Sequence, residues 1–371
     1  MELKSIKLKD CIFEVDARNT NLEVNNLLGV TINKVFIPSV ANINGTDLSK
    51  YKIINKNQFV CGLMQVSRDE GVAIALYKNN NRAIVSPAYY VFEVISDIVL
   101  PEYLELIFCS SEFDREATFN AVGGVRGTLT WEDFCNMTIS IPSLDEQKKF
   151  VNQINTLKER LRHIEQLQRK LMLCSQTMYK NILSMSDEVI KESILTNACT
   201  LIKSGVNPFD GEKKFLTTSD VLFDSINEKA DMISYNNRPS RANMSPTEQS
   251  LWFAKMKNTK KYIFIKENKM NNFIFSTGFA GLKANDTFFY WLWCFMLSEE
   301  FETQKDALCN GTTQEAINEE GIRNIYISYP VDINLVNDFS NQVKPMFEYY
   351  QLLMKEKVIL SQIIELYISK I

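Results

Sequence analysis

Residues 137–151 read MTISIPSLDEQKKFV, and this sequence shows most clearly how the chain is organised. Its first part, as far as Pro142, is rich in β-branched and apolar side chains, which is typical of a buried strand that a proline terminates. From Leu144 onward the apolar residues instead follow a helical spacing. Residues 325–330 read IYISYP and again precede a helical pattern. The chain therefore contains two strand-to-helix junctions of one kind.

These junctions belong to an internal repeat with an offset of about 188 residues, which is visible when the chain is aligned with itself. Each copy contains a helix that closes on S-x-x-F, a Gly-containing polar loop, a short amphipathic stretch and the proline-terminated strand. We therefore expect two copies of one domain. The matched positions are Tyr103 with Trp291, Leu104 with Leu292, Ser110 with Ser298, Phe113 with Phe301, Gly123 with Gly311, Leu129 with Ile317, Phe134 with Ile322, Ile139 with Ile327 and Pro142 with Pro330.

A long amphipathic helix is predicted after each junction, with seam residues spaced alternately by four and three as in a coiled coil. The first seam comprises Leu157, Leu161, Ile164, Gln168, Leu171, Ser175, Met178 and Ile182. The second comprises Val343, Met346, Tyr350, Leu353, Lys357, Leu360, Ile364, Tyr367 and Ile371. We expect the two helices to pair as an antiparallel coiled coil whose polar seam residues fix the register. The alternative is that each helix packs back on its own domain.

The predicted chain is therefore α+β and has four parts. Mixed α/β globular domains at residues 1–143 and 187–330 form a tandem repeat, and helical spacers follow them at residues 144–186 and 331–371. No run of about 18 apolar residues occurs, and the N-terminus alternates charged and apolar residues rather than showing a signal-peptide core. We expect a cytoplasmic protein that does not interact with a membrane.

Charge and composition restrict the classes of function. The 371 residues include 41 Lys+Arg and 45 Asp+Glu, and the net charge of −4 disfavours an indiscriminate polyanion binder. Any DNA binding is expected to be local. Residues 238–269 carry eight basic and two acidic side chains, which indicates either such a site or a solvated basic face. The eight cysteines form no C-x-x-C pair and His163 is the only histidine, so we expect reduced thiols and no zinc site.

Motifs for catalysis are incomplete in this sequence. Residues 207–210 read NPFD and lack the second proline of the N-P-P-Y/F loop with which adenine methyltransferases hold a flipped base. The E-x-K matches at residues 212–214 and 267–269 are as short as chance matches in a charged chain, and the phosphate-binding G-x-x-x-x-G-K-[ST] pattern is absent. We predict a non-catalytic chain with no metal and no cofactor of its own.

The order of globular domain, long helix, globular domain and long helix resembles the specificity subunits of type I restriction-modification systems, called HsdS. Residues 139–151 are similar to the junction between a target recognition domain of that family and its helical spacer. The second junction departs from the pattern, because residues 330–336 read PVDINLV without an acidic-Gln opening. Further similar segments are residues 34–39, 47–51 and 84–89 in the first copy and residues 204–209, 238–244, 276–282 and 310–317 in the second.

The resemblance implies that each target recognition domain reads one half of a split double-stranded DNA target, and that the helices set the spacing between the halves. It also implies that partner subunits supply all the catalysis. These partners are two methyltransferase (modification) subunits and a restriction subunit that is a translocase and nuclease. S-adenosylmethionine, ATP and Mg are expected on the partners.

Candidate DNA contacts follow from the chemistry of base edges, since Arg pairs with guanine and Asn or Gln pairs with adenine, while other Lys and Arg hold phosphates. The candidates for base edges in the second copy are Arg238, Arg241 and Asn243, together with Thr312, Thr313 and Gln314 behind Gly311. The candidates for phosphates are Lys255, Lys257, Lys260 and Lys261. The equivalents in the first copy are Gln65, Arg68, Arg82, Arg115 and Arg126.

Two other functions stay open at this point. The duplicated domains could be a scaffold that binds protein, in which case the basic stretch is only solvated. The chain could also be the recognition subunit of another methyltransferase-nuclease system. Salt-dependent DNA binding separates the scaffold from both recognition subunits, because only phosphate contacts release counterions.

Overall fold

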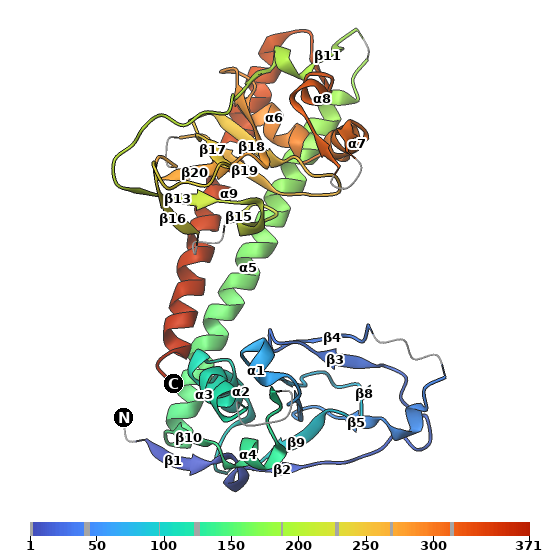
Figure 1. The fold of residues 1–371 in the computed structure, drawn as a ribbon. Helices are drawn as coiled ribbons and strands as arrows, with labels where there is room; N and C mark the ends of the chain where they lie inside the picture. Colours follow the sequence, from blue (N-terminus) through green and yellow to red (C-terminus); the bar gives the residue numbers. More distant parts are fainter. Residues whose placement is uncertain are drawn as a thin grey trace. The chain divides into compact units, whose positions relative to one another are not determined.

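The computed structural model describes residues 3–40, 45–95, 97–121, 127–186, 188–226, 230–267, 270–311 and 315–371, which form a mixed α+β fold (Figure 1). The chain divides into two compact units. Residues 1–162 and 358–371 make up the first unit, and residues 163–357 make up the second. The long helices α5 (Leu144–Leu183) and α9 (Ile333–Ile368) each contribute to both units.

An antiparallel sheet in the order β2-β9-β6-β7 forms the centre of the first unit. Its strands are β2 (Ile12–Glu14), β6 (Phe59–Gly62), β7 (Ala73–Leu76) and β9 (Tyr90–Val94). The Phe59 ring stacks on Phe92 of the neighbouring strand at 5.1 Å and meets Phe108 of α2 edge-on at 5.3 Å. Aromatic packing therefore fixes α2 against this sheet.

Short strand pairs and helices complete the first unit. The strand pairs are β1 (Lys4–Lys7) with β10 (Thr138–Ile141), β3 (Leu28–Val30) with β4 (Phe36–Pro38), and β5 (Lys52–Ile54) with β8 (Ala83–Val85). The helices are η1 (Leu8–Asp10), η2 (Leu48–Lys50), α1 (Val66–Asp69), α2 (Pro101–Phe108), α3 (Ser111–Ala121) and α4 (Trp131–Asn136).

The second unit contains an antiparallel sheet of the same design, in the order β12-β21-β18-β19. Its strands are β12 (Cys199–Leu201), β18 (Ser250–Ala254), β19 (Tyr262–Ile265) and β21 (Phe279–Ala284). Helix α6 (Phe289–Met296) follows this sheet as α2 follows the first one, and all eight of its residues are buried. The sheets of the two units thus share strand order and strand direction.

The second unit also contains a second four-stranded sheet, which has no counterpart among the described residues of the first unit. It has the order β16-β13-β20-β17, with β13 and β20 parallel. Its strands are β13 (Glu212–Leu216), β16 (Asp231–Ser234), β17 (Ala242–Met244) and β20 (Phe273–Ser276). The other elements are β11 (Ile190–Ile194) paired with β24 (Tyr326–Pro330), β14 (Val221–Leu222) with β15 (Ser225–Ile226), β22 (Cys309–Asn310) with β23 (Ala316–Ile317), η4 (Leu195–Asn197), η5 (Thr218–Asp220), α7 (Glu299–Ala307) and α8 (Glu319–Arg323).

The repeated S-x-x-F sequence has one structural role in both units. The Ser110 hydroxyl accepts a hydrogen bond from the Phe113 backbone N–H at 3.2 Å, and Ser298 accepts the equivalent bond from Phe301 at 3.2 Å. Each serine thus caps the start of a helix, α3 or α7, whereas the sequence pattern predicts that a helix closes at this point. The cap satisfies a backbone donor that the helix leaves free. Both phenylalanines are buried, so the cap also directs a core side chain inward.

Helices α5 and α9 contact each other within each unit, and the contacting residues show that the two helices run antiparallel. In the first unit, the rings of Phe150 and Tyr367 lie 5.9 Å apart. In the second unit, Lys357 Nζ lies 2.8 Å from Glu165 Oε1. All the seam positions predicted on both helices are buried or half-buried.

Among the residues that the structure describes, no helix is long and apolar enough to cross a bilayer.

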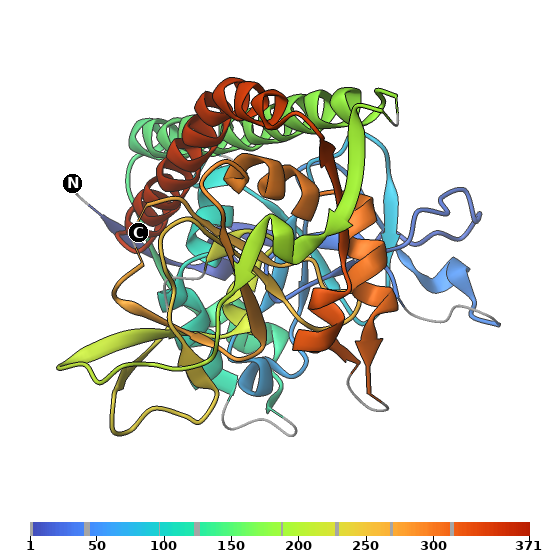
Figure 2. The ribbon, with the colours of Figure 1, turned by 90° about the horizontal axis from the view of Figure 1, so that it is seen from above.

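The N-terminal half of α9 also packs on the aromatic core of its own unit. The Phe339 ring lies 4.9 Å from Trp291, and Phe347 lies 5.1 Å from Trp293. In this unit α6 therefore lies between α9 and the sheet (Figure 2). The helix serves both as a partner of α5 and as a core element.

Candidate nucleic-acid interface

The loop between β16 and β17 carries the base-edge candidates Arg238 and Arg241, and the candidate Asn243 follows it in β17. It encloses a pocket of about 220 Å³ lined by Tyr235, Asn236, Arg238, Pro239, Ser240 and Asn243. Two of the three residues predicted from this segment, Arg238 and Asn243, thus line one pocket. Arg241 is exposed in the same loop.

The guanidinium of Arg238 is held in place by Tyr235. Its Cζ atom lies 4.1 Å from the centre of the Tyr235 ring, and its Nη1 donates a hydrogen bond to the Tyr235 carbonyl at 2.7 Å. A cation over an aromatic face is attracted by the ring quadrupole. Both contacts restrict the rotamers of a long side chain before any ligand arrives.

Backbone hydrogen bonds join this loop to two other segments. Thr277 N–H donates to the Arg241 carbonyl at 2.8 Å, and Gly205 N–H donates to the Asn243 carbonyl at 2.8 Å. The segments at residues 204–209, 238–244 and 276–282, which looked family-like in the sequence, thus meet in space. Because β16, β17 and β20 belong to one sheet, the loop has a rigid base.

The phosphate candidates lie on the turn between β18 and β19, which we call the basic turn (residues 255–261). It adjoins the β16–β17 loop through the β20–β21 turn, because Lys255 N–H donates to the Gly278 carbonyl at 2.9 Å. Two further backbone bonds reach the 310–317 segment, from Ile317 N–H to Lys255 O at 2.9 Å and from Lys257 N–H to Glu315 O at 3.0 Å. The structure therefore brings the basic turn close to the β20–β21 turn, which is bonded to Arg241, and to residues 315–317.

The four lysines of the basic turn differ in environment. Burial lowers the pKa of Lys255. Lys257 forms a 2.7 Å ion pair with Glu315, and this hydrogen bond raises the pKa of Lys257. Lys260 is exposed, and Lys261 donates through Nζ to the Thr218 carbonyl at 2.6 Å. Only Lys257 of the four is paired with a carboxylate among the described residues, so the other three contribute net positive charge.

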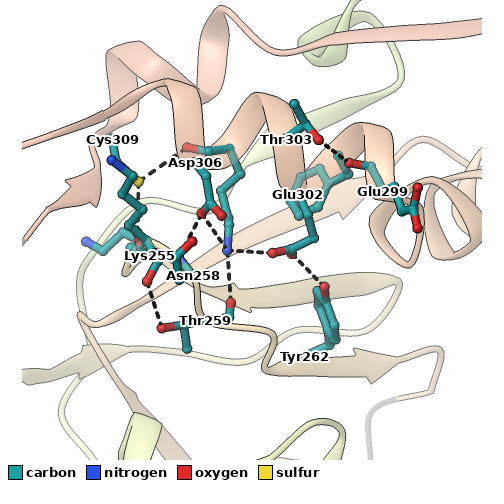
Figure 3. A network of polar contacts seen from close by, with 12 residues as sticks. Lys255, Asn258, Thr259, Tyr262, Glu299, Glu302, Thr303, Asp306 and Cys309 are labelled. Atoms are coloured by element: carbon teal, nitrogen blue, oxygen red, sulfur yellow. Dashed lines mark hydrogen bonds and ion pairs between the residues drawn. The ribbon is translucent and has the colours of Figure 1, made fainter.

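A buried polar network on α7 anchors the basic turn (Figure 3). The Lys305 side chain has 0% exposure, and its Nζ donates to the Thr259 carbonyl at 2.9 Å. The neighbouring Asp306 accepts from the Asn258 backbone N–H at 3.0 Å. Asn258 has a φ of 56°, a conformation that non-glycine residues rarely adopt without such support. Two adjacent helix residues thus fix the middle of the turn.

Two carboxylates on α7 balance the positive charge of the buried Lys305 ammonium. Lys305 Nζ lies 3.0 Å from Glu302 Oε2 and 3.3 Å from Asp306 Oδ1. Tyr262 of β19 donates a hydrogen bond to Glu302 Oε1 at 2.6 Å. Burial is the main cause that raises the pKa of Tyr262, and this hydrogen bond raises it further. A buried charge is tolerated when it is paired and its donors are satisfied. The network thus joins α7, the basic turn and β19.

The candidates of the first unit are placed differently. Arg68 pairs with Asp69 at 2.7 Å, Arg82 with Glu23 at 3.3 Å and Arg115 with Glu112 at 2.5 Å. Gln65 is exposed at the start of α1 with a φ of 65°. The predicted contacts Arg126, Thr312, Thr313 and Gln314 lie outside the described residues. The candidate arginines that are described in this unit are therefore each neutralised by a neighbouring acid.

Sequence reasoning missed Tyr235 and the α7 network. The Tyr235-to-Arg238 spacing of three residues is compatible with ring stacking in a turn, and this signal was available. Lys305 gave no such signal, because E-T-Q-K-D at residues 302–306 reads as an exposed helical face with ordinary charge pairs. Its burial depends on the β18–β19 turn, which lies far away in the sequence.

Residues 2–173 match the family model of the type I restriction modification DNA specificity domain. The chain is also similar to the solved type I restriction-modification S subunit from M. genitalium, with 12% identity, coverage of 100% of this chain and 96% of that chain, and a TM-score of 0.57. The corresponding values for the HsdS subunit from Thermoanaerobacter tengcongensis are 16%, 99%, 96% and 0.36. For a chain from a structure on complex assembly and conformational transition of the type I R-M system they are 16%, 99%, 97% and 0.44.

No curated protein matches the chain in sequence. The likeness to the M. genitalium subunit, at 12% identity, concerns the fold and agrees with the mixed α+β architecture. The family match concerns the sequence, and it covers the first sheet, its helices and the larger part of α5. Residues 2–173 thus carry a type I restriction modification DNA specificity domain, as the resemblance drawn from the sequence predicted.

Proposed function

We propose that this chain is the non-catalytic specificity subunit of a type I restriction-modification complex and that it reads a bipartite double-stranded DNA target. The observation that carries the proposal is that residues 2–173 match a DNA specificity domain while the second unit repeats the sheet of the first in order and direction. Two such domains in one chain provide two DNA-binding domains, one for each half of a target. A split target is the natural ligand of such a pair.

In this proposal the two globular parts are target recognition domains, and α5 and α9 form an antiparallel coiled coil that spaces the two half-sites. The opposed contacts between Phe150 and Tyr367 in one unit and between Glu165 and Lys357 in the other support this arrangement. Buried polar seam residues such as Gln168 and Ser175 support a fixed register, since a polar seam residue favours one alignment of helices. The register then sets the number of unread base pairs.

The same proposal assigns the chemistry to partner subunits in the cytoplasm. Two methyltransferase subunits would bind S-adenosylmethionine and methylate adenine, and a restriction subunit would use ATP and Mg to translocate and cleave DNA. The net charge of −4 fits a chain that positions DNA inside a larger assembly, where other subunits neutralise part of the phosphate backbone. Isolated, the chain is expected to bind DNA poorly.

The test is single-molecule methylome sequencing of a methylation-free host that expresses this chain together with the methyltransferase encoded beside it. The matched control is the methyltransferase alone. A split motif with adenine methylated in each half, present only with this chain, is the expected result. If the complex assembles and its methyltransferase is active but no motif appears, the specificity function is wrong and a protein-binding scaffold is favoured.

A further inference from the structure

The pocket between β16 and β17 is lined by the side chains that base recognition uses. An arginine, two asparagines and a serine line it, and these offer guanidinium, amide and hydroxyl groups on one small surface. Tyr235 supplies the aromatic side of the pocket and the stacking surface for Arg238. The lysines of the adjacent basic turn add positive charge beside the pocket, since Lys255, Lys260 and Lys261 have no carboxylate partner among the described residues.

Only some of the hydrogen-bond donors of the Arg238 guanidinium are occupied by the described residues of the protein. Its Nη1 donates to the Tyr235 carbonyl, and none of the described residues accepts a hydrogen bond from Nε or Nη2. A guanidinium presents its donors in a fixed plane, so the free Nε and Nη2 form a ready bidentate edge. The Tyr235 ring, 4.1 Å away, restricts the plane in which this edge can lie.

We propose that Arg238, positioned by Tyr235, reads a guanine in the major groove of one half of the target. The inference rests on the proposed function and specifies one contact within it. Guanine presents O6 and N7 as two adjacent acceptors in the major groove, and these match a bidentate arginine edge. Asn243 and Ser240 line the same pocket and are placed to contact the neighbouring base or backbone.

A phosphate is the other group that a polar pocket of this kind could bind, and substitution by lysine separates the two ligands. Lysine keeps the charge and can hold a phosphate as a point charge, but it loses the planar fork. A guanine contact therefore weakens in Arg238→Lys, whereas a phosphate contact persists. Loss of a bidentate base contact is expected to reduce discrimination at one position by about tenfold to a hundredfold.

The experiment sequences the methylome of hosts that express the methyltransferase with the wild-type chain, Arg238→Lys, Arg238→Ala or Tyr235→Leu. Arg323→Lys is the matched control, because Arg323 lies on α8 of the same unit and pairs with Glu319 at 3.0 Å on the surface. Thermal unfolding of each purified complex checks that the second unit is folded. Read counts at every single-base variant of the motif measure discrimination.

We expect the wild-type motif to contain a fixed G·C pair that becomes degenerate in Arg238→Lys and Arg238→Ala, with every other position retained. Tyr235→Leu should relax the same position to a smaller extent, and Arg323→Lys should leave the motif unchanged. An unaltered motif in Arg238→Lys, or an equal loss of methylation at all sites in Arg238→Ala, would overturn the guanine contact while leaving the specificity function intact. Absence of any motif with the wild-type chain would instead overturn the proposed function, and the inference with it.

Discussion

Each unit contains a sheet with the same strand order, but the candidate basic side chains of the two units differ in whether a carboxylate neutralises them. In the first unit, the described candidate arginines each pair with an acid, as Arg115 does with Glu112. In the second unit, Lys261 donates to a backbone carbonyl and Lys260 is exposed. A paired arginine adds no net charge to its surface, whereas these lysines do. Phosphate attraction should therefore be concentrated in the second unit.

The same position on equivalent helices shows a second difference. Asp114 on α3 and Glu302 on α7 are separated by the repeat offset, and both contact a lysine. Lys34 comes from the β3–β4 turn of the first unit, whereas Lys305 comes from α7 itself. The repeat thus conserves the acid of an internal ion pair but not the origin of its lysine. Each unit uses the acid to anchor a different turn.

The largest expected effect is the loss of the α7 network. Lys305→Met should destabilise the second unit by about 3–5 kcal/mol, because Glu302 and Asp306 would lose their buried cation and the basic turn would lose its bond to Thr259. Lys34→Met is the matched variant in the first unit, where the lysine side chain is 10% exposed rather than fully buried. Urea-induced unfolding monitored by circular dichroism measures both, and an equal or smaller loss in Lys305→Met would contradict the anchoring role.

A second prediction tests the charge difference itself. Replacing Lys255, Lys260 and Lys261 together by Gln should weaken DNA binding of the assembled methyltransferase complex by about tenfold to a hundredfold, and should lower the log-log salt slope by about 2.7. The matched variant replaces Arg68, Arg82 and Arg115 by Gln, and it should change both quantities less because those arginines are ion-paired. Fluorescence anisotropy titrations between 50 and 200 mM salt, a range over which such contacts change affinity strongly, provide the comparison. Equal effects of the two triple variants would remove the distinction between the units.

Sequence reasoning reached the parts of this molecule that depend on short-range pattern. The repeat predicted that the two copies are equivalent at S-x-x-F, and Ser110 and Ser298 do make the same hydrogen bond. The expectation that S-x-x-F closes a helix was wrong, because each serine caps the start of the next helix, α3 or α7. The change of period at residues 137–151 predicted a helix from Leu144, where α5 begins. These features depend on spacing and local capping, so they can be read from the sequence without knowledge of the tertiary contacts.

The remaining features depend on contacts between distant segments. Residues 238–269 looked like one basic stretch, but the structure places Arg238 and Arg241 in the β16–β17 loop and its four central lysines in the basic turn. Thr277 and Gly278 connect the loop and the turn. Helix α9 was expected to pair with α5, with packing on its own domain as the alternative. Within the second unit, Lys357 of α9 contacts Glu165 of α5 and Phe339 of α9 contacts Trp291 of α6, so the alternative describes part of the helix. No local pattern specifies which turn covers Lys305, so its burial could not be predicted.

The smallest expected effect comes from releasing the arginines of the first unit. Asp69→Asn and Glu112→Gln would remove the carboxylates whose pKa values the hydrogen bonds from Arg68 and Arg115 lower. Because exposed ion pairs contribute little to stability, the fold should be unaffected. Each freed arginine should raise DNA affinity about two- to threefold at low salt and steepen the salt slope by up to about 0.9, provided that it faces the backbone. Anisotropy titrations of each single variant in the assembled complex measure this gain, with Glu319→Gln on α8 as the control for loss of one surface charge. An affinity gain that matches the control would mean that these arginines lie away from DNA, and the first unit would then have to bind its half-site through other residues.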